Sequence, residues 1–186
     1  MFDIPPPATR EQLADAVDQV QREAAAYWSS FTTPEFFAKL GDAWSPADNV
    51  RHLVKSIRPV VKALRQPKIL LRILFGRSRR GSVTYDALRT RYFAALDAGG
   101  QAGRFGPSSR SESDLEAWRV EIMEQFAQQN RELRAAIGRW PEKSLDRLQI
   151  PHPLLGKLTV REMLFFTIYH QLHHMEVVQR RVAATA

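Results

Sequence analysis

The sequence predicts an all-α protein: a four-helix bundle with short accessory helices and one long crossover connection. Four segments of helical length carry apolar residues at steps of three and four, as helices around a shared core do. No segment shows a convincing alternation of apolar and polar residues, the pattern of a half-buried strand. The chain of 186 residues is long enough for one domain with a substantial core, so we expect residues 1–186 to form a single domain.

The first predicted helix covers residues 9–29. Thr9 and Gln12 have the spacing of a capping box, in which each side chain binds the backbone N–H of the other residue. The apolar face of this segment is formed by Leu13, Val17, Val20 and Ala24. A short helix is expected in the following loop, after Thr33 and Pro34.

The second predicted helix begins at Ser45, with Pro46 at its first position, where proline leaves no N–H unpaired. Its apolar face consists of Val50, Leu53, Val54, Ile57, Val60, Val61 and Leu64. Pro59 inside this pattern predicts a kink or a break, because its ring removes one hydrogen bond of the helix. Pro67 is expected to end the helix, and the apolar and basic segment 68–76 has no predicted packing partner.

The remaining elements are a shorter helix, a crossover and two long helices. The shorter helix is predicted over residues 84–96, and the Gly-, Ser- and Pro-rich segment 99–113 is predicted to be a long crossover loop. The third long helix is expected from Ser113, with Glu116 completing a capping box, to Gly138. The last begins at Thr159, capped with Glu162, and ends near Val182. It is apolar around most of its circumference, which predicts a central position in the bundle.

Two histidines on the last helix are the strongest functional signal. His170 and His174 stand four residues apart on a mostly apolar face, where two imidazoles can bind one metal ion. The structural interpretation is that each neutral ring is satisfied by a local hydrogen bond, which is costly for two rings in an apolar wall. His173 lies on another face and is predicted to be a surface or edge residue. His152, in a proline-flanked loop, is predicted to have a structural role in a turn.

His52 is a third candidate, early in the second predicted helix and about 140° from the centre of its apolar stripe. Its own face carries Asn49, Ser56, Pro59 and Ala63. Small and polar residues of this kind suit the wall of a cavity or a close contact with another helix. Alone, His52 would be read as a surface residue. Beside His170 and His174, it predicts three imidazoles that leave a coordination position open, as a catalytic divalent metal requires.

Composition limits the remaining classes. The chain has no cysteine, which excludes disulfides, thiolate ligands and a cysteine nucleophile, so any reacting thiol must be a cosubstrate. No apolar run approaches the ~18 residues that span a bilayer, and residues 1–7 lack the features of a signal peptide. We therefore expect a cytoplasmic protein with no membrane partner.

The net charge of +7 is concentrated in residues 51–80, which contain ten Lys or Arg residues and no Asp or Glu. The basic positions recur at helical steps, as on the solvated face of an amphipathic helix or the rim of an oligomer. Two further interpretations are help in binding an acidic substrate and contact with nucleic acid or membrane. Nucleic-acid binding would predict strongly salt-dependent retention on DNA.

Three sequence blocks resemble the DinB-like superfamily of metal-binding four-helix bundles. They are residues 44–53 (WSPADNVRHL), 152–162 (HPLLGKLTVRE) and 169–174 (YHQLHH). Their order and separation are together fairly specific, and the matching framework runs from about residue 10 to residue 182. The resemblance implies a bundle of the DinB-like type with a long crossover.

The same resemblance implies that His52, His170 and His174 bind a divalent metal ion, for which zinc, nickel, iron and cobalt are not distinguishable. Frequent dimers in the family imply a homodimer. Some members resemble thiol-dependent transferases or isomerases, and others resemble metal-dependent hydrolases. The family name comes from a damage-inducible gene and does not establish DNA binding, so we expect no nucleic-acid partner.

We therefore expect a metal-dependent enzyme that acts on a small molecule, as a thiol-dependent S-transferase or a hydrolase. The alternative is a metal-stabilised stress-response or binding bundle without turnover, and the coordination sphere discriminates the two: an open position beside a pocket favours catalysis. No general base is identified. Asn49 and Gln171 are candidates for groups that hydrogen-bond the metal ligands.

Overall fold

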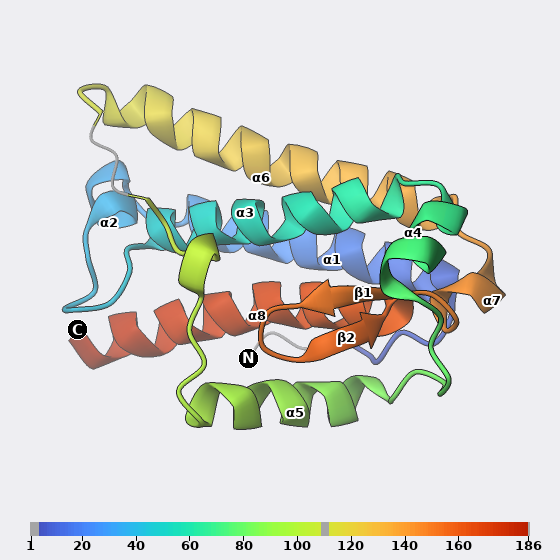
Figure 1. Ribbon diagram of the computed structural model, residues 1–186. Coiled ribbons are helices and arrows are strands. Elements are labelled where there is room, and N and C mark those ends of the chain that lie inside the picture. The colour runs from blue at the N-terminus through green and yellow to red at the C-terminus, as the bar shows by residue number, and fades with distance from the viewer. Residues whose placement is uncertain (1–3, 109–111, 186) are drawn as a thin grey trace.

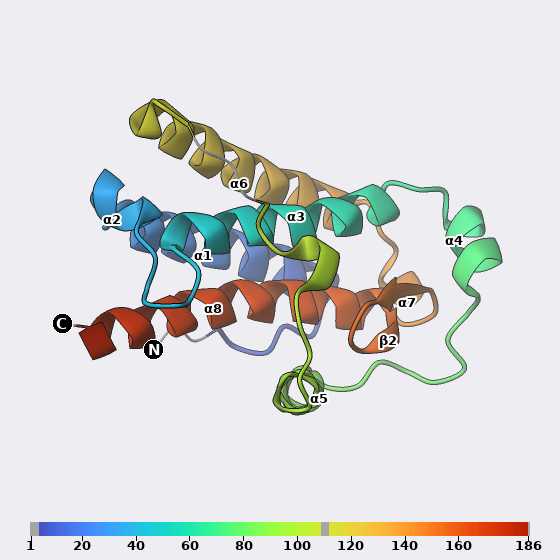
Figure 2. The same cartoon turned by 60° about the vertical axis from the view of Figure 1, so that its left-hand side comes forward.

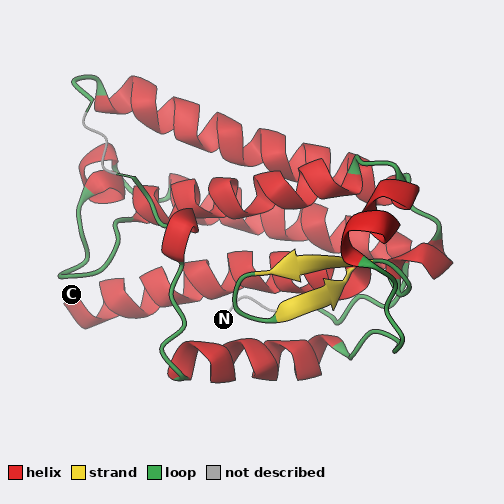
Figure 3. Cartoon of the chain, viewed as in Figure 1, coloured by secondary structure: helices red, strands yellow, loops and turns green. Residues whose placement is uncertain are grey.

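A computed structural model describes residues 4–108 and 112–185, and these residues form a mostly helical protein (Figures 1 and 3). The four long helices are α1 (Arg10–Ser29), α3 (Pro46–Leu64), α6 (Leu115–Gly138) and α8 (Val160–Thr185). The short elements are α2 (Thr33–Phe37), α4 (Lys68–Phe75), α5 (Tyr85–Asp97), the 3-10 helix η1 (Gly103–Phe105), α7 (Glu142–Leu145), β1 (Gln149–His152) and β2 (Gly156–Thr159).

The four long helices form the predicted bundle. Helix α6 packs against α1 and α3, and α8 packs against the same two helices on the other side. In Figure 1, α1 and α8 run in one direction while α3 and α6 run in the other. Because the neighbours α3 and α6 are parallel, the chain between them must return along the whole bundle. This return is the long crossover, and it carries α4, α5 and η1.

The helix boundaries follow local capping. The predicted capping boxes at Thr9 and at the start of α8 are both present. At α6 the predicted cap is wrong by one residue, because the side chain of Asp114, rather than Ser113, accepts the hydrogen bond from a first-turn N–H. Pro59 does not break its helix: α3 continues to Leu64, where it ends before Pro67.

The prediction of no strand is wrong, because β1 and β2 form an antiparallel hairpin that pairs Gln149 with Thr159 and His152 with Gly156. Each strand has four residues, too few for the alternation of buried and exposed positions to stand out. Pro151, which resembles a loop residue, is tolerated because a two-stranded hairpin has only edge strands.

The crossover places its elements on the outside of the bundle. Helix α5 packs against α8, and Figure 2 shows α5 along its own axis beside that helix. The 3-10 helix η1 packs against α3. The segment 68–76, which had no predicted place, forms α4 and packs against β1. Of the predicted crossover loop, residues 109–111 lie outside the described residues, as do residues 1–3 of the N-terminal segment.

Part of the basic segment 51–80 has partners within the protein. The guanidinium of Arg51 lies 3.2 Å from Asp48, and that of Arg80 binds the buried carboxylate of Glu162 through both oxygens. These contacts stabilise the fold, so not all of the positive charge is available to an external partner. No helix in the described part of the chain is long and apolar enough to cross a bilayer.

A candidate metal centre between α3 and α8

The three predicted histidines are brought together where α3 crosses α8. His52 is in the second turn of α3, whose start is fixed by the Ser45 cap. His170 and His174 project from the same face of α8, one turn apart. All three side chains are buried, with relative exposures of 4%, 5% and 8%. Imidazoles from two helices therefore meet inside the protein rather than at its surface.

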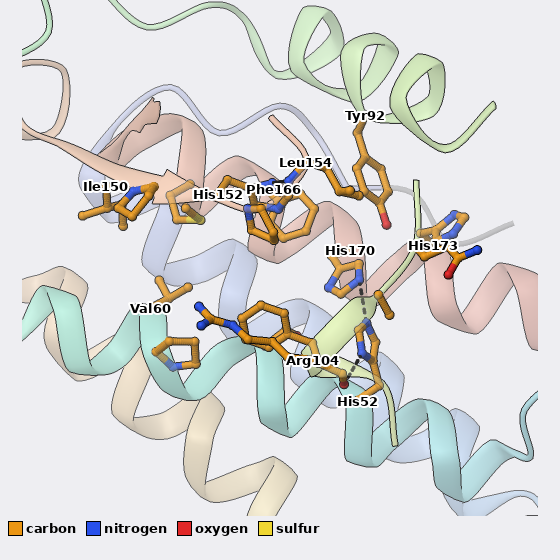
Figure 4. A pocket seen from close by; sticks show the side chains of 18 of the residues that line it. His52, Val60, Tyr92, Arg104, Ile150, His152, Leu154, Phe166, His170 and His173 are labelled. Atoms are coloured by element: carbon orange, nitrogen blue, oxygen red, sulfur yellow. Dashed lines mark hydrogen bonds between the residues drawn. The ribbon is translucent and has the colours of Figure 1, made fainter. Parts of the chain in front are cut away.

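The Nε2 atoms of the three rings converge, and Figure 4 shows the rings of His52 and His170 directed toward each other. The distance from His170 Nε2 to His52 Nε2 is 3.1 Å, and to His174 Nε2 it is 3.0 Å. One nitrogen from each ring can be chosen so that all lie within 4.8 Å of one another. The triangle is compact enough for three nitrogens to contact one ion.

The rings of His52 and His174 each make a hydrogen bond through Nδ1, on the side away from the cluster, and this bond determines the tautomer. The carbonyl oxygen of Phe105 lies 2.9 Å from His52 Nδ1, and a carbonyl can only accept, so this Nδ1 carries the proton. His174 Nδ1 likewise donates to Asn49 Oδ1, at 2.7 Å. The Asn49 amide is oriented by its own Nδ2, which donates to the Ser45 carbonyl at 2.8 Å. Both neutral rings therefore present an Nε2 lone pair to the cluster.

This arrangement of donors fits a divalent ion. A proton on His170 Nε2 could be donated to only one of the two facing lone pairs, so at least one lone pair would face the cluster without a donor. An unsatisfied buried acceptor costs about 1–3 kcal/mol. A cation bound at the three Nε2 atoms removes that cost. The hydrogen bonds from His52 and His174 to oxygen acceptors are also those that commonly orient metal-ligating histidines.

Burial keeps the three imidazoles neutral. It lowers the pKa of His52 below the ordinary 6.5 and lowers the pKa of His170 and His174 well below that value. For His170 and His174, the proximity of the other histidines lowers the pKa further, because each protonated ring would repel the next. Neutral imidazole is the form that binds a metal ion.

Aromatic rings pack around the cluster. The Trp44 ring is nearly parallel to that of His174, with centroids 6.2 Å apart, and also contacts His52. Phe166 stacks on His170, with centroids 4.8 Å apart. These contacts restrict rotation of the imidazoles. Each ring is thus held on one side by packing, and two of the three are also held by a hydrogen bond.

A cavity of about 530 Å³ adjoins the cluster. Its walls come from α3, α4, α5, η1, the β-hairpin and α8, elements that meet only in the folded protein. Ser56, Pro59 and Ala63 line it, so of the two interpretations of this helix face, a cavity wall and a close contact with another helix, these residues fit the cavity wall. The histidines are reached from this cavity.

The other polar residues singled out in the sequence lie around this site. His152 has the predicted turn role, since its Nδ1 accepts from the backbone N–H groups of Leu154 and Leu155, at 3.2 and 3.1 Å. It also lines the cavity. Gln171 is fully buried, but its amide donates to the Thr167 carbonyl on its own helix. Asn49, rather than Gln171, is the side chain that orients a histidine.

His173 and Tyr92 form the cavity wall next to the cluster. His173 is half-buried rather than on the open surface, with its ring 5.8 Å from that of Tyr92 between centroids. Its Nδ1 is buried without a hydrogen-bond partner among the described residues. The Tyr92 ring is 6.0 Å from that of His170, and Figure 4 shows its hydroxyl directed into the cavity.

Several residues of the site were missed from the sequence. Tyr92, Arg104 and the Phe105 carbonyl belong to the crossover and reach the cavity or the cluster only through the fold. A backbone carbonyl leaves no signal in a sequence. Trp44 was identified as part of a motif but not as a residue of the cavity wall.

Comparisons with known proteins agree with this architecture. A sequence model of the DinB superfamily matches residues 16–178. Among solved structures, the chain is similar to the crystal structure of TT2238, described as a four-helix bundle protein, with a TM-score of 0.57 and 16% sequence identity. The match covers 92% of this chain and 99% of that chain, and at this identity it bears on the fold alone. The search of curated proteins gave no match.

Proposed function

The chain belongs to the DinB superfamily, and from that premise we propose that it is a metal-dependent enzyme whose divalent ion is bound by His52, His170 and His174. The adjoining cavity is then the place where a small-molecule substrate binds. The reaction we favour is thiol-dependent S-transfer, with hydrolysis as the related outcome when water replaces the thiol.

The convergence of three Nε2 atoms is the observation that carries this proposal. Two of the three distances between them are 3.0 and 3.1 Å, and at least two atoms present lone pairs rather than protons. Three neutral ligands leave the ion its full double charge. A bound divalent ion lowers the pKa of a thiol or water molecule that it contacts, which supplies a nucleophile near neutral pH. Because the chain has no cysteine, a reacting thiol would enter as a cosubstrate.

The protein's own residues would hold the substrate and exclude water. The cavity walls are mainly apolar, which strengthens electrostatic interactions inside the cavity. Among the described residues that line it there is no carboxylate to act as a general base. Tyr92 offers a hydroxyl donor, and burial lowers the pKa of His173 to about 4, so that this ring is neutral near pH 7. These two side chains are the candidates for orienting the reacting groups.

The alternative, a metal-stabilised bundle without turnover, would place the ion in a closed coordination sphere within a dry core. A cavity of about 530 Å³ beside the histidines instead supports an open position for a substrate.

One set of preparations tests the proposal. Protein made without an affinity tag is expected to contain one divalent ion per chain. His52→Ala, His170→Ala and His174→Ala should each lose it, because two ligands hold a metal poorly. His173→Ala is the matched control on the same helix and should keep its metal. Unchanged metal content in any of the first three variants, or loss in the control, would show that the ligands are wrongly chosen.

The same preparations separate catalysis from stabilisation. Metal-loaded protein is incubated with a small thiol and an aryl halide electrophile, and separately with an activated ester without thiol. We expect product formation in at least one assay that His170→Ala abolishes. A metal-loaded protein no faster than His170→Ala in both assays would favour the bundle without turnover.

A further inference from the structure

The cavity beside the three histidines has an asymmetric charge. Of the described residues that line it, Arg104 is the single permanent cation, and none is Asp or Glu. The remaining polar side-chain groups are histidines, hydroxyls, the Trp44 indole and the amide of Gln101. A divalent ion on the histidines would add positive charge and no negative charge. The cavity therefore has an uncompensated positive potential.

Arg104 has no carboxylate partner among the described residues, in contrast to the arginines that form ion pairs within the fold. Arg51 is paired with Asp48, and Arg161 with Asp146. Among the described residues, the Arg104 guanidinium packs on the Phe105 ring, with its central carbon 5.1 Å from the ring centroid, and it has no hydrogen bond to any of them. It thus retains its hydrogen-bond donors for a ligand.

The position of Arg104 separates two regions of the cavity. In Figure 4 it lies between the side that holds His52 and His170 and the side lined by Val60 and Ile150. Val60 and Ile150 are apolar, and the cavity as a whole is lined by further apolar side chains, among them Ala63, Phe75, Leu96 and Leu154. A ligand that fills the cavity would place an apolar body against this wall and a polar group near the guanidinium.

We infer that the cavity selects a small, largely apolar molecule that carries one anionic group, such as a carboxylate or sulfonate, and that Arg104 binds this group. The inference rests on the proposed function in treating the cavity as the substrate site. A cationic ligand would meet only positive charge, and a strongly polar one would leave its groups unpaired against the apolar wall. Arg104 is thereby a specificity-determining residue.

The test uses two fluorescent probes with the same ring skeleton. 8-Anilinonaphthalene-1-sulfonate is an apolar anion, and N-phenyl-1-naphthylamine is its uncharged counterpart. Fluorescence titration should show tighter binding of the anion. Arg104→Gln should raise the Kd of the anion roughly tenfold or more and change that of the neutral probe by less than about twofold, as expected for loss of one charged hydrogen-bond partner. Arg79→Gln, at an exposed arginine outside the cavity, is the matched control and should change neither.

Two further variants locate the probes. Ala63→Phe fills the cavity from α3 and should weaken both probes, while Ile73→Ser removes an exposed apolar residue of α4, 72% exposed, and should weaken neither. The inference is overturned if Arg104→Gln binds the anion as wild type does, or if Ile73→Ser rather than Ala63→Phe abolishes binding. Metal content is measured on the same samples. Wild-type protein that prefers the anion but contains no metal would refute the metal proposal alone. Metal-containing protein in which Arg104→Gln leaves the anion affinity unchanged would refute the Arg104 assignment alone.

Discussion

Asn49 and the Phe105 carbonyl determine which nitrogen of two histidines faces the cluster. Each accepts a hydrogen bond from a protonated Nδ1, Asn49 from that of His174 and the Phe105 carbonyl from that of His52, and so leaves Nε2 without a proton. The two acceptors come from different parts of the chain. Asn49 precedes His52 by one turn of α3, whereas Phe105 lies in the crossover. A single helix therefore supplies one ligand and the residue that orients another.

Replacing Asn49 with alanine should weaken the metal site without removing a ligand. His174 would lose the acceptor that fixes its tautomer and ring orientation, which typically costs 10–100-fold in metal affinity. We expect the Kd for zinc, measured by competition with a chromophoric chelator, to rise by roughly that factor. Ser56→Ala is the control from the same face of α3, since the Ser56 hydroxyl binds the Leu53 carbonyl. Equal zinc affinity in wild type and Asn49→Ala would show that Asn49 is not needed to orient His174.

At the scale of the elements, the crossover is shaped by the turn after α5. Gly99 has a φ of +89°, a conformation that side chains disfavour. At Gly100 the constraint is space: an added Cβ would lie 2.6 Å from the Ala95 carbonyl oxygen and 3.3 Å from Leu154. This close approach lets the chain double back past the hairpin toward η1. The turn thereby sets the position of the Phe105 carbonyl and Arg104.

Gly100→Ala should destabilise the protein by about 1–3 kcal/mol, because the contact is with backbone, which cannot move aside as a flexible side chain would. The measurement is the free energy of unfolding in urea. The matched control is Gly81→Ala, where an added Cβ meets nothing within 4 Å, and it should be close to neutral. Equal cost in the two variants would mean that the turn after α5 has room to adjust.

The sequence was sufficient to predict the long helices and the residues that share a face of one helix. It was not sufficient to predict features that several elements build together. The four long helices follow from apolar periodicity over many residues, and the pairing of His170 with His174 follows from one helix alone. The hairpin escaped because each strand has four residues and β1 contains Pro151. Glu162 was predicted to cap the last helix, but its full burial was not predictable, because its partner Arg80 reaches it from the crossover. A sequence pattern does not report such distant partners.

The whole molecule divides its roles between bundle and crossover. The bundle supplies the three histidines from α3 and α8, while α5, η1 and the hairpin enclose the cavity in front of them. All five histidines of the chain lie on or beside this cavity: His52, His152, His170, His173 and His174. Burial is the largest cause of a lowered pKa at each of them. Their titration is therefore a property of the entire fold.

Metal-free protein should lose stability as the pH falls below about 6.5. In the unfolded chain the histidines take up protons near that pH, whereas in the folded protein they stay neutral, with values of about 4 for His152 and His173. The unfolded state then binds more protons, and each such histidine removes about 1.4 kcal/mol per pH unit between its two pKa values. Urea unfolding at pH 7.5, 6.5 and 5.5 measures the loss.

The pH range distinguishes the histidines from the buried carboxylate. For Glu162, burial raises the pKa, but hydrogen bonds from Arg80 and from the Val83 and Thr159 N–H groups outweigh it, so the pKa is lowered from 4.5. Its stabilising contribution is thus present above pH 4.5 and is lost only as the pH falls below that value. His152→Gln, which leaves the three candidate ligands in place, should make the dependence between pH 6.5 and 5.5 shallower by up to one proton. The contrary outcome is a free energy of unfolding that stays constant from pH 7.5 to 5.5 and falls only at lower pH, where the carboxylates are protonated. That result would mean that the cavity admits enough water to hydrate its histidines. The enclosed site inferred from their burial would then have to be abandoned.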